Sequence, residues 1–148
     1  MRHLRNHHEP IQVDAYWGEL EARLREVPGL IAVYLYGSYG TPLQTPLSDV
    51  DLALVFRLGS EPSFDAELEL AGVVTETLRE EDVSAVVLNR SPSPFQYRVL
   101  STGRKLFATD ETALSDFVEQ VCKRHGDFVI DYERFAREYD QALVEAYG

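Results

Sequence analysis

The chain of 148 residues has only one cysteine, Cys122, so no disulfide can form within it. This fits a reducing compartment, and we expect a cytoplasmic protein in which Cys122 is a buried thiol on a helix. Residues 1–10 lack the apolar stretch of a secretory signal, and we expect residues 1–12 to form a flexible arm. No apolar run approaches the ~20 residues that cross a bilayer, which predicts that the protein has no membrane segment.

Basic residues are scarce. The chain has 14 Lys and Arg against 25 Asp and Glu, a net charge of −11. A broad nucleic-acid surface needs a basic stripe, so this balance argues against one. The charge suits a basic protein partner, although an acidic surface that only keeps the protein soluble is the alternative. The histidines have no zinc or nucleophile spacing and are expected on the surface: His3, His7, His8 and His125.

The most informative stretch runs from residue 30 to residue 56. Residues 30–36 are apolar and predict a buried strand. Gly37 and Ser38 break this strand, and Asp49-Val50-Asp51 opens a second apolar run ten residues later. The pattern therefore predicts a strand, a glycine turn and a second strand that begins with two acids.

Asp49 and Asp51 are expected to point to the same face, because side chains alternate along a strand. The apolar side chains between and after them then point into a core: Val50, Leu52, Leu54 and Phe56. Two neighbouring carboxylates repel each other unless a cation lies between them. Oxygen ligands favour Mg²⁺, which often completes its shell with water and substrate phosphates. The two acids therefore predict a magnesium site.

Gly37 and Ser38 are suited to the phosphates of a nucleotide. Glycine lets the backbone approach closely, and the amides that follow and the Ser38 hydroxyl can donate to phosphate oxygens. The alternative is a simple tight turn before an exposed acidic strand. Two acids on one face beside a Gly-Ser turn favour the nucleotide site.

The rest of the chain predicts one α+β domain, a mixed sheet flanked by helices. Helices are expected from Asp14 to about Val27, capped by Asp14, and from a Ser63 cap to about Glu80. Residues 82–89 and 105–108 suit strands, with a short helix between them that ends near Gly103. A long final helix begins at Thr109 or Asp110.

The apolar stripes of these helices define the expected core. The first helix offers Val13, Trp17, Leu20, Leu24 and Val27, and the second offers Phe64, Leu68, Ala71, Val74 and Leu78. The last helix has a first stripe, Leu114, Phe117, Val118 and Val121, and a second, Tyr132, Phe135, Tyr139 and Leu143. Gly126 is expected to bend this helix.

The spacing Gly-Ser, about ten residues, Asp-x-Asp resembles the nucleotidyltransferase superfamily of the DNA polymerase β type. The likeness is strongest to the minimal nucleotidyltransferases, the MntA-type antitoxins encoded beside HEPN-type ribonuclease toxins. Residues 88–90, 97–100 and 103–107 follow in an order that looks like the second half of that family. The resemblance implies a single minimal nucleotidyltransferase domain over residues 13–148.

The resemblance also implies an activity. Family members are described as transferring AMP from ATP to a tyrosine hydroxyl of the partner toxin, which silences it. Carried over by motif, Asp49 and Asp51 would hold Mg²⁺, and Gly37 and Ser38 would bind the nucleotide. The implied partner is a HEPN-type toxin, with which the chain can form a hetero-oligomer.

The chain departs from the family pattern after the Gly-Ser turn. Relatives often carry an arginine where this sequence has Thr41. A charged phosphate contact is then either missing or supplied by Arg90, Arg98 or Arg104. The alternative for each of these arginines is a solvated or ion-paired surface residue.

A second departure concerns the third carboxylate of the superfamily, which binds metal and helps to deprotonate the acceptor. Its position here holds Ser84, and Asp82 lies two residues earlier on the same face, ~7 Å away. Asp82 is therefore the candidate third catalytic acid and metal ligand, or only the exposed start of a strand. Without a third acid, the protein would be an impaired enzyme that neutralises the toxin by binding alone. A third reading, an aminoglycoside-type nucleotidyltransferase, needs more chain for an acceptor domain.

Overall fold

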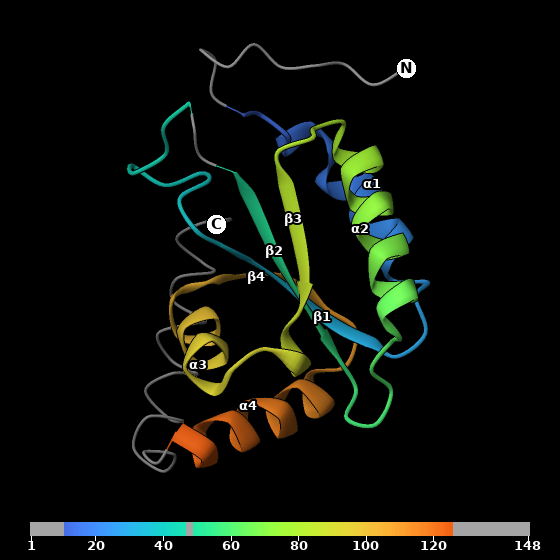
Figure 1. Ribbon diagram of the computed structural model, residues 1–148, viewed down its shortest axis with the longest axis vertical. Coiled ribbons are helices and arrows are strands. Elements are labelled where there is room, and N and C mark those ends of the chain that lie inside the picture. Colours follow the sequence, from blue (N-terminus) through green and yellow to red (C-terminus); the bar gives the residue numbers. More distant parts are fainter. Residues whose placement is uncertain (1–10, 47–48, 126–148) are drawn as a thin grey trace.

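The computed structural model describes residues 11–46 and 49–125. Its elements follow the expected order along the chain (Figure 1). They are η1 (Asp14–Tyr16), α1 (Trp17–Leu24), β1 (Leu30–Tyr36), β2 (Val50–Phe56), α2 (Phe64–Leu78), β3 (Val83–Val87), η2 (Leu88–Arg90), α3 (Ser93–Thr102), β4 (Arg104–Ala108) and α4 (Glu111–His125). The second apolar stripe of the last helix, and the bend at Gly126, lie outside the described residues.

The four strands form one mixed sheet in the order β3-β2-β1-β4. β1 runs antiparallel to β2 and to β4, whereas β2 and β3 are parallel. Helices cover both faces, with α1 and α2 on one side and α3 and α4 on the other (Figure 1). The predicted α+β class, a mixed sheet flanked by helices, is confirmed.

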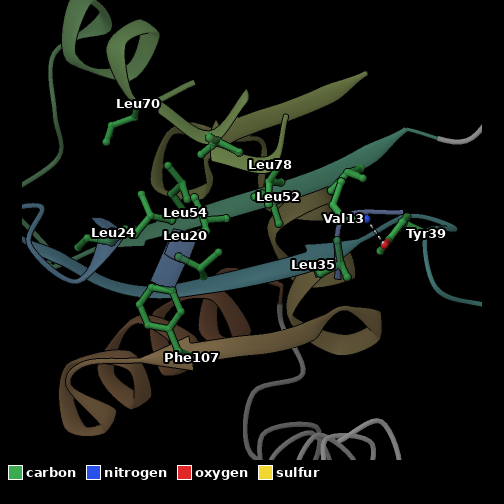
Figure 2. Packing of buried hydrophobic residues seen from close by; sticks show 14 of the residues in the cluster. Val13, Leu20, Leu24, Leu35, Tyr39, Leu52, Leu54, Leu70, Leu78 and Phe107 are labelled. Carbon is green, nitrogen blue, oxygen red and sulfur yellow. Dashed lines mark hydrogen bonds between the residues drawn. The ribbon is translucent and has the colours of Figure 1, made fainter. Parts of the chain in front are cut away.

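The central strand β2 is buried on both faces, and its alternation fixes where the acids point. Leu52 and Leu54 pack in the cluster under α1 and α2, shown in Figure 2, whereas Ala53 and Val55 pack under α3 and α4. Asp51 has the parity of Ala53 and Val55, so it lies on the α3/α4 face of the sheet.

The start of the first helix differs from the prediction. Residues 14–16 form a 3₁₀ turn with no side-chain cap, and α1 begins only at Trp17. The Asp14 carboxylate accepts hydrogen bonds from the Trp17 indole (3.0 Å) and from the Tyr39 hydroxyl (2.8 Å) instead. The prediction of Asp14 as a helix cap was wrong, because side-chain partners take its carboxylate. Ile11, which the arm was expected to include, is buried in the core.

The second helix was predicted correctly at its cap and only in part on its face, where Val74 and Leu78 are buried as expected. Ser63 accepts a hydrogen bond from the Ala66 amide (3.1 Å), as expected of a cap. Phe64 and Leu68 are 75% and 72% exposed, although the sequence placed them in the core. The buried stripe is Leu70, Val74 and Leu78, because this set continues to the end of the helix against the sheet.

The first apolar stripe predicted for the last helix is confirmed, since Leu114, Phe117, Val118 and Val121 are buried. Asp110 caps it by accepting a hydrogen bond from the Ala113 amide (3.0 Å), whereas Thr109 donates to the Leu30 carbonyl. The Ala113 amide, and then the Arg57 guanidinium, lower the pKa of the Asp110 carboxyl. Within the described part of the chain, no helix has the length and apolar character to cross a membrane.

Candidate nucleotide and metal site

The glycine turn predicted from the sequence lies directly against the second acid. Gly37 has φ +79°, a conformation that favours glycine. A Cβ at this position would lie 2.5 Å from Asp51 Oδ2 and 3.5 Å from its carboxyl carbon. The absence of a side chain at Gly37 therefore leaves the space in which the Asp51 carboxylate lies.

Three residues form a row across the strands beside this turn. Asp51 on β2 pairs with Tyr36 on β1 and with Ser84 on β3, so all three point to the α3/α4 face. The Ser84 hydroxyl donates a hydrogen bond of 3.0 Å to Asp51 Oδ1. One oxygen of the carboxylate is thus held by Ser84, and the other faces Gly37.

Tyr36 completes the row on its other side. Burial raises the pKa of its phenol, and the Asp51 charge raises it further, whereas a hydrogen bond with Ser84 and the Arg98 charge lower it. The ring packs edge-on against Phe95 of α3, with centroids 5.4 Å apart. Tyr36 was not among the site residues predicted from the sequence, because the pairing that places it beside Asp51 comes from the strand register.

The other two predicted acids lie one step before the row. Asp49 is exposed and directly precedes β2, and the half-buried Asp82 directly precedes β3. The Asp82 carbonyl accepts a hydrogen bond of 3.0 Å from the Val50 amide, and its own amide donates to Glu80. Because Val50 pairs with Val83, the register places Asp82 level with Asp49 rather than with Asp51.

Ser84 therefore stands opposite Asp51, and no register shift brings Asp82 to that position. Over residues 11–46 and 49–125, no group of three His, Cys, Asp or Glu side chains is arranged to hold a metal ion. The roles of Asp49, Asp51 and Asp82 as metal ligands stay predictions, and so do the nucleotide contacts of Gly37 and Ser38.

The turn after β1 is tied together by its own polar groups. The Thr41 amide (3.0 Å) and hydroxyl (2.6 Å) both donate to the Ser38 carbonyl. The Gly40 amide donates to the Gln44 side chain (2.8 Å), which in turn donates to the Ile11 carbonyl. Thr41, where relatives often carry arginine, serves here to close the turn.

Tyr39 fixes the turn to the N-terminal segment. Its hydroxyl accepts a hydrogen bond from the Val13 amide (2.9 Å), drawn in Figure 2, and donates to Asp14. Burial, more than any charge, raises the pKa of this phenol to about 12. A cavity of about 470 Å³ lies on this side of the turn, lined in part by Tyr16 and Tyr39.

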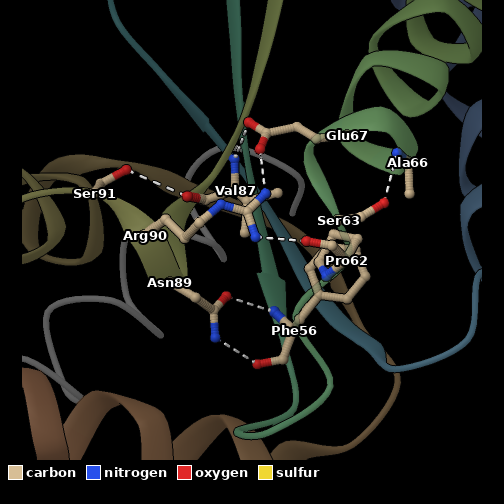
Figure 3. A network of polar contacts seen from close by, with 9 residues as sticks. All are labelled: Phe56, Pro62, Ser63, Ala66, Glu67, Val87, Asn89, Arg90 and Ser91. Carbon is tan, nitrogen blue, oxygen red and sulfur yellow. Dashed lines mark hydrogen bonds and ion pairs between the residues drawn. The ribbon is translucent and has the colours of Figure 1, made fainter.

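The three candidate arginines have different surroundings. Arg90 lies beyond the end of β3, at the far end of the sheet, where it binds Glu67 and the Pro62 carbonyl (Figure 3). Arg104 pairs with Leu35 on the α1 face and donates to the Tyr39 carbonyl beneath the turn. Arg98 lies on α3, on the same face of the sheet as Asp51.

The donor set of this site fits Mg²⁺. Asp51 directs one carboxylate oxygen toward the turn at Gly37, where there is no side chain, and the exposed Asp49 two residues earlier would supply further oxygens. Oxygen ligands from one or two carboxylates, completed by phosphates and water, are the usual environment of this ion. Asp49 and Asp51 would hold it, with Ser84 orienting Asp51 from behind.

Two kinds of comparison with known proteins give matches, one of sequence and one of structure. The sequence matches the family described as polymerase beta, nucleotidyltransferase, over residues 19–112. One similar solved chain comes from a tri-AMPylated Shewanella oneidensis HEPN toxin in complex with MNT antitoxin, at 23% identity and a TM-score of 0.61, covering 88% of this chain and 99% of that one.

A second similar chain belongs to a toxin–antitoxin crystal structure with AMP-PNP. It is 25% identical, covers 85% of this chain and 98% of that one, and has a TM-score of 0.63. No curated protein matches the sequence. Because the family match spans more than half of its residues, the chain belongs to the polymerase β-type nucleotidyltransferases.

Proposed function

We propose that the protein is a Mg²⁺-dependent adenylyltransferase and the antitoxin of a HEPN-type toxin. It transfers AMP from ATP to a hydroxyl, a tyrosine hydroxyl in our proposal, of that toxin in the cytoplasm. Support comes from the family match and from similarity to chains of an AMPylated HEPN toxin–MNT antitoxin complex and of a toxin–antitoxin structure with AMP-PNP. The net charge of −11 suits a basic partner.

The observation that carries this proposal is the contact between Gly37 and Asp51. A missing Cβ at Gly37 leaves room for a carboxylate at the point where the backbone turns. The turn can then offer amides to phosphate oxygens within reach of a metal held by the acids. In nucleotidyl transfer, this arrangement would bring the phosphates bound by the turn close to the metal ion.

The residues of this chain position the substrates rather than form a covalent intermediate. Asp49 and Asp51 would hold Mg²⁺, which would neutralise charge on the triphosphate. Gly37 and Ser38 hold the phosphates, so that the acceptor oxygen lies in line with the bond to the leaving pyrophosphate. The Ser84 hydroxyl keeps Asp51 in one orientation through its 3.0 Å hydrogen bond.

The test incubates a purified HEPN-type toxin, the proposed partner, with this protein, ATP and Mg²⁺. We expect the intact mass of the toxin to rise by one or more AMP groups, and Asp51→Asn to prevent the increase. Asparagine has the shape of aspartate and keeps an oxygen that can accept the hydrogen bond from Ser84. We therefore expect Asp51→Asn to stay folded, so that a loss of transfer reports on the site. An unchanged toxin mass with the parent protein would refute the transfer reaction.

A second function has one observation in its favour, the serine opposite Asp51. If the site lacks a third acid, the protein neutralises its toxin by contact alone. The double variant Asp49→Asn, Asp51→Asn separates the two cases in a toxin growth assay. We expect it to lose protection, and full protection by this variant would instead favour neutralisation by binding.

A further inference from the structure

We propose that Arg98 of α3 binds the phosphates of the nucleotide. This inference rests on the proposed function, because it concerns the substrate of the same site. It selects one of the three arginines that the sequence offered.

Arg98 is connected to the row of Tyr36, Asp51 and Ser84 through one aromatic ring. Its guanidinium carbon lies 5.7 Å from the centre of the Phe95 ring, and that ring packs edge-on against Tyr36 at 5.4 Å. Tyr36 is the direct cross-strand neighbour of Asp51. The Phe95 ring thus lies between the guanidinium and Tyr36, on the face of the sheet to which Asp51 points.

Arg98 is also the candidate arginine whose charge is available. It is exposed, and within the described ranges it forms no ion pair with a carboxylate. Arg90 is bound to Glu67 at the opposite end of the sheet. Arg104 lies on the other face, where its guanidinium holds the Tyr39 carbonyl and contacts Gly40.

The charge balance of the site favours such a group. A triphosphate brought beside Asp49 and Asp51 adds more negative charge than one Mg²⁺ neutralises. A guanidinium offers several donors in a plane that matches phosphate oxygens, and its contacts with phosphate are among the stronger hydrogen bonds in proteins. The stacking of Arg98 on Phe95 holds the guanidinium in place without using its donors, which leaves them for the ligand.

The test is the affinity for ATP in the presence of Mg²⁺, measured by calorimetry on the full chain. We expect Arg98→Ala to weaken ATP binding by about ten- to a hundred-fold, the usual effect of losing a hydrogen bond to a charged group. Arg98→Lys keeps the charge but loses the planar donor geometry, so it should retain part of the affinity.

The matched control is Arg25→Ala. Arg25 also stacks on a phenylalanine, Phe107, at 5.0 Å, but it follows α1 at the other end of β1. Arg25→Ala changes the net charge by the same amount as Arg98→Ala. Because Arg25 lies away from the candidate site, we expect this variant to bind ATP with the affinity of the parent. Melting temperatures establish that each variant is folded. If Arg98→Ala does not fold, the test uses Arg98→Lys.

Three outcomes would overturn the inference, and only the last also overturns the proposed function. If the parent binds ATP with Mg²⁺ and Arg98→Ala binds it equally well, Arg98 is not a phosphate ligand, while the proposed function stands. If Arg25→Ala loses as much ATP affinity as Arg98→Ala, the effect comes from the net charge and not from a contact of Arg98 with phosphate. If the parent binds no ATP at all, the proposed function fails first and this inference fails with it.

Discussion

Replacing Gly37 with alanine tests the central contact of the site. The new Cβ would lie 2.5 Å from Asp51 Oδ2, and contacts under 3.0 Å are essentially never seen for a real Cβ, so the two must separate by at least about 0.5 Å. Asp51 is not free to turn away, because Ser84 holds its other oxygen. The substitution must therefore either break that hydrogen bond or move the turn.

The expected cost has two parts. An alanine at φ +79° is strained by roughly 1–2 kcal/mol, whatever surrounds it. Displacing the carboxylate adds about 1 kcal/mol for the lost hydrogen bond with Ser84. We expect Gly37→Ala to lower the free energy of unfolding by about 2–3 kcal/mol and to abolish Mg²⁺-dependent ATP binding.

Gly59 provides a matched control for the backbone strain. It has φ +88°, and a Cβ there would meet no atom within 4 Å. Gly59→Ala should therefore show the strain alone, about 1–2 kcal/mol in urea unfolding, with ATP binding intact. The difference between the two variants isolates the contact with Asp51.

A double-mutant cycle makes the test specific. In an Asp51→Ala background the carboxylate is absent, so Gly37→Ala should cost only what Gly59→Ala costs. If Gly37→Ala costs the same with and without Asp51, the contact has no energetic weight and the reasoning behind this site is wrong.

Three further predictions concern the acids, the turn and the far end of the sheet. Asp51→Asn should remove Mg²⁺-dependent ATP binding while leaving the melting temperature equal to or above the parent's, because it relieves repulsion; calorimetry showing equal affinity would contradict this. Tyr39→Phe should cost about 1–3 kcal/mol, since it leaves the buried Val13 amide without its partner. The pKa of Tyr39 is raised to about 12 in the folded protein, so between pH 10 and 12 the unfolded chain loses a proton that the folded chain keeps. Stability should therefore fall as the pH rises above 10, with a smaller slope in Tyr39→Phe, and equal slopes would count against that assignment. Asn89→Ala should cost about 1–3 kcal/mol by removing both hydrogen bonds (2.9 Å each) to the Phe56 backbone, seen in Figure 3, without changing ATP affinity; a stability equal to the parent's would refute this.

The parts of the fold predicted correctly depend on short-range patterns. The strand, turn and strand around Gly37 follow from alternation and from a glycine, which act over a few residues. The Ser63 cap was likewise readable, since it needs only an amide three residues away. These features could be predicted because each depends on residues close together in the sequence.

The failures depend on contacts between distant parts of the chain. Phe64 and Leu68 have helical spacing but are exposed, and Leu70 is buried with the correctly predicted Val74 and Leu78. Asp14 has the chemistry of a cap, but Tyr39, far along the chain, takes its carboxylate. Periodicity predicts that a helix has an apolar face, but it does not determine which apolar residues on or beside that face pack against the sheet.

The candidate site shows the same division. The sequence predicted that Asp51 and Gly37 belong to one site, because both lie on a single strand–turn–strand unit. Which residue stands opposite Asp51 is decided by the register of β2 against β3, and that register places Ser84 there and leaves Asp82 level with Asp49. A shift of two residues would exchange a hydroxyl for a carboxylate beside Asp51, at a position where like charges repel directly. The serine instead donates to Asp51 and fixes one of its oxygens. With the glycine turn on the opposite side, that hydrogen bond leaves the carboxylate a single orientation, which is what a metal ligand on a rigid strand requires.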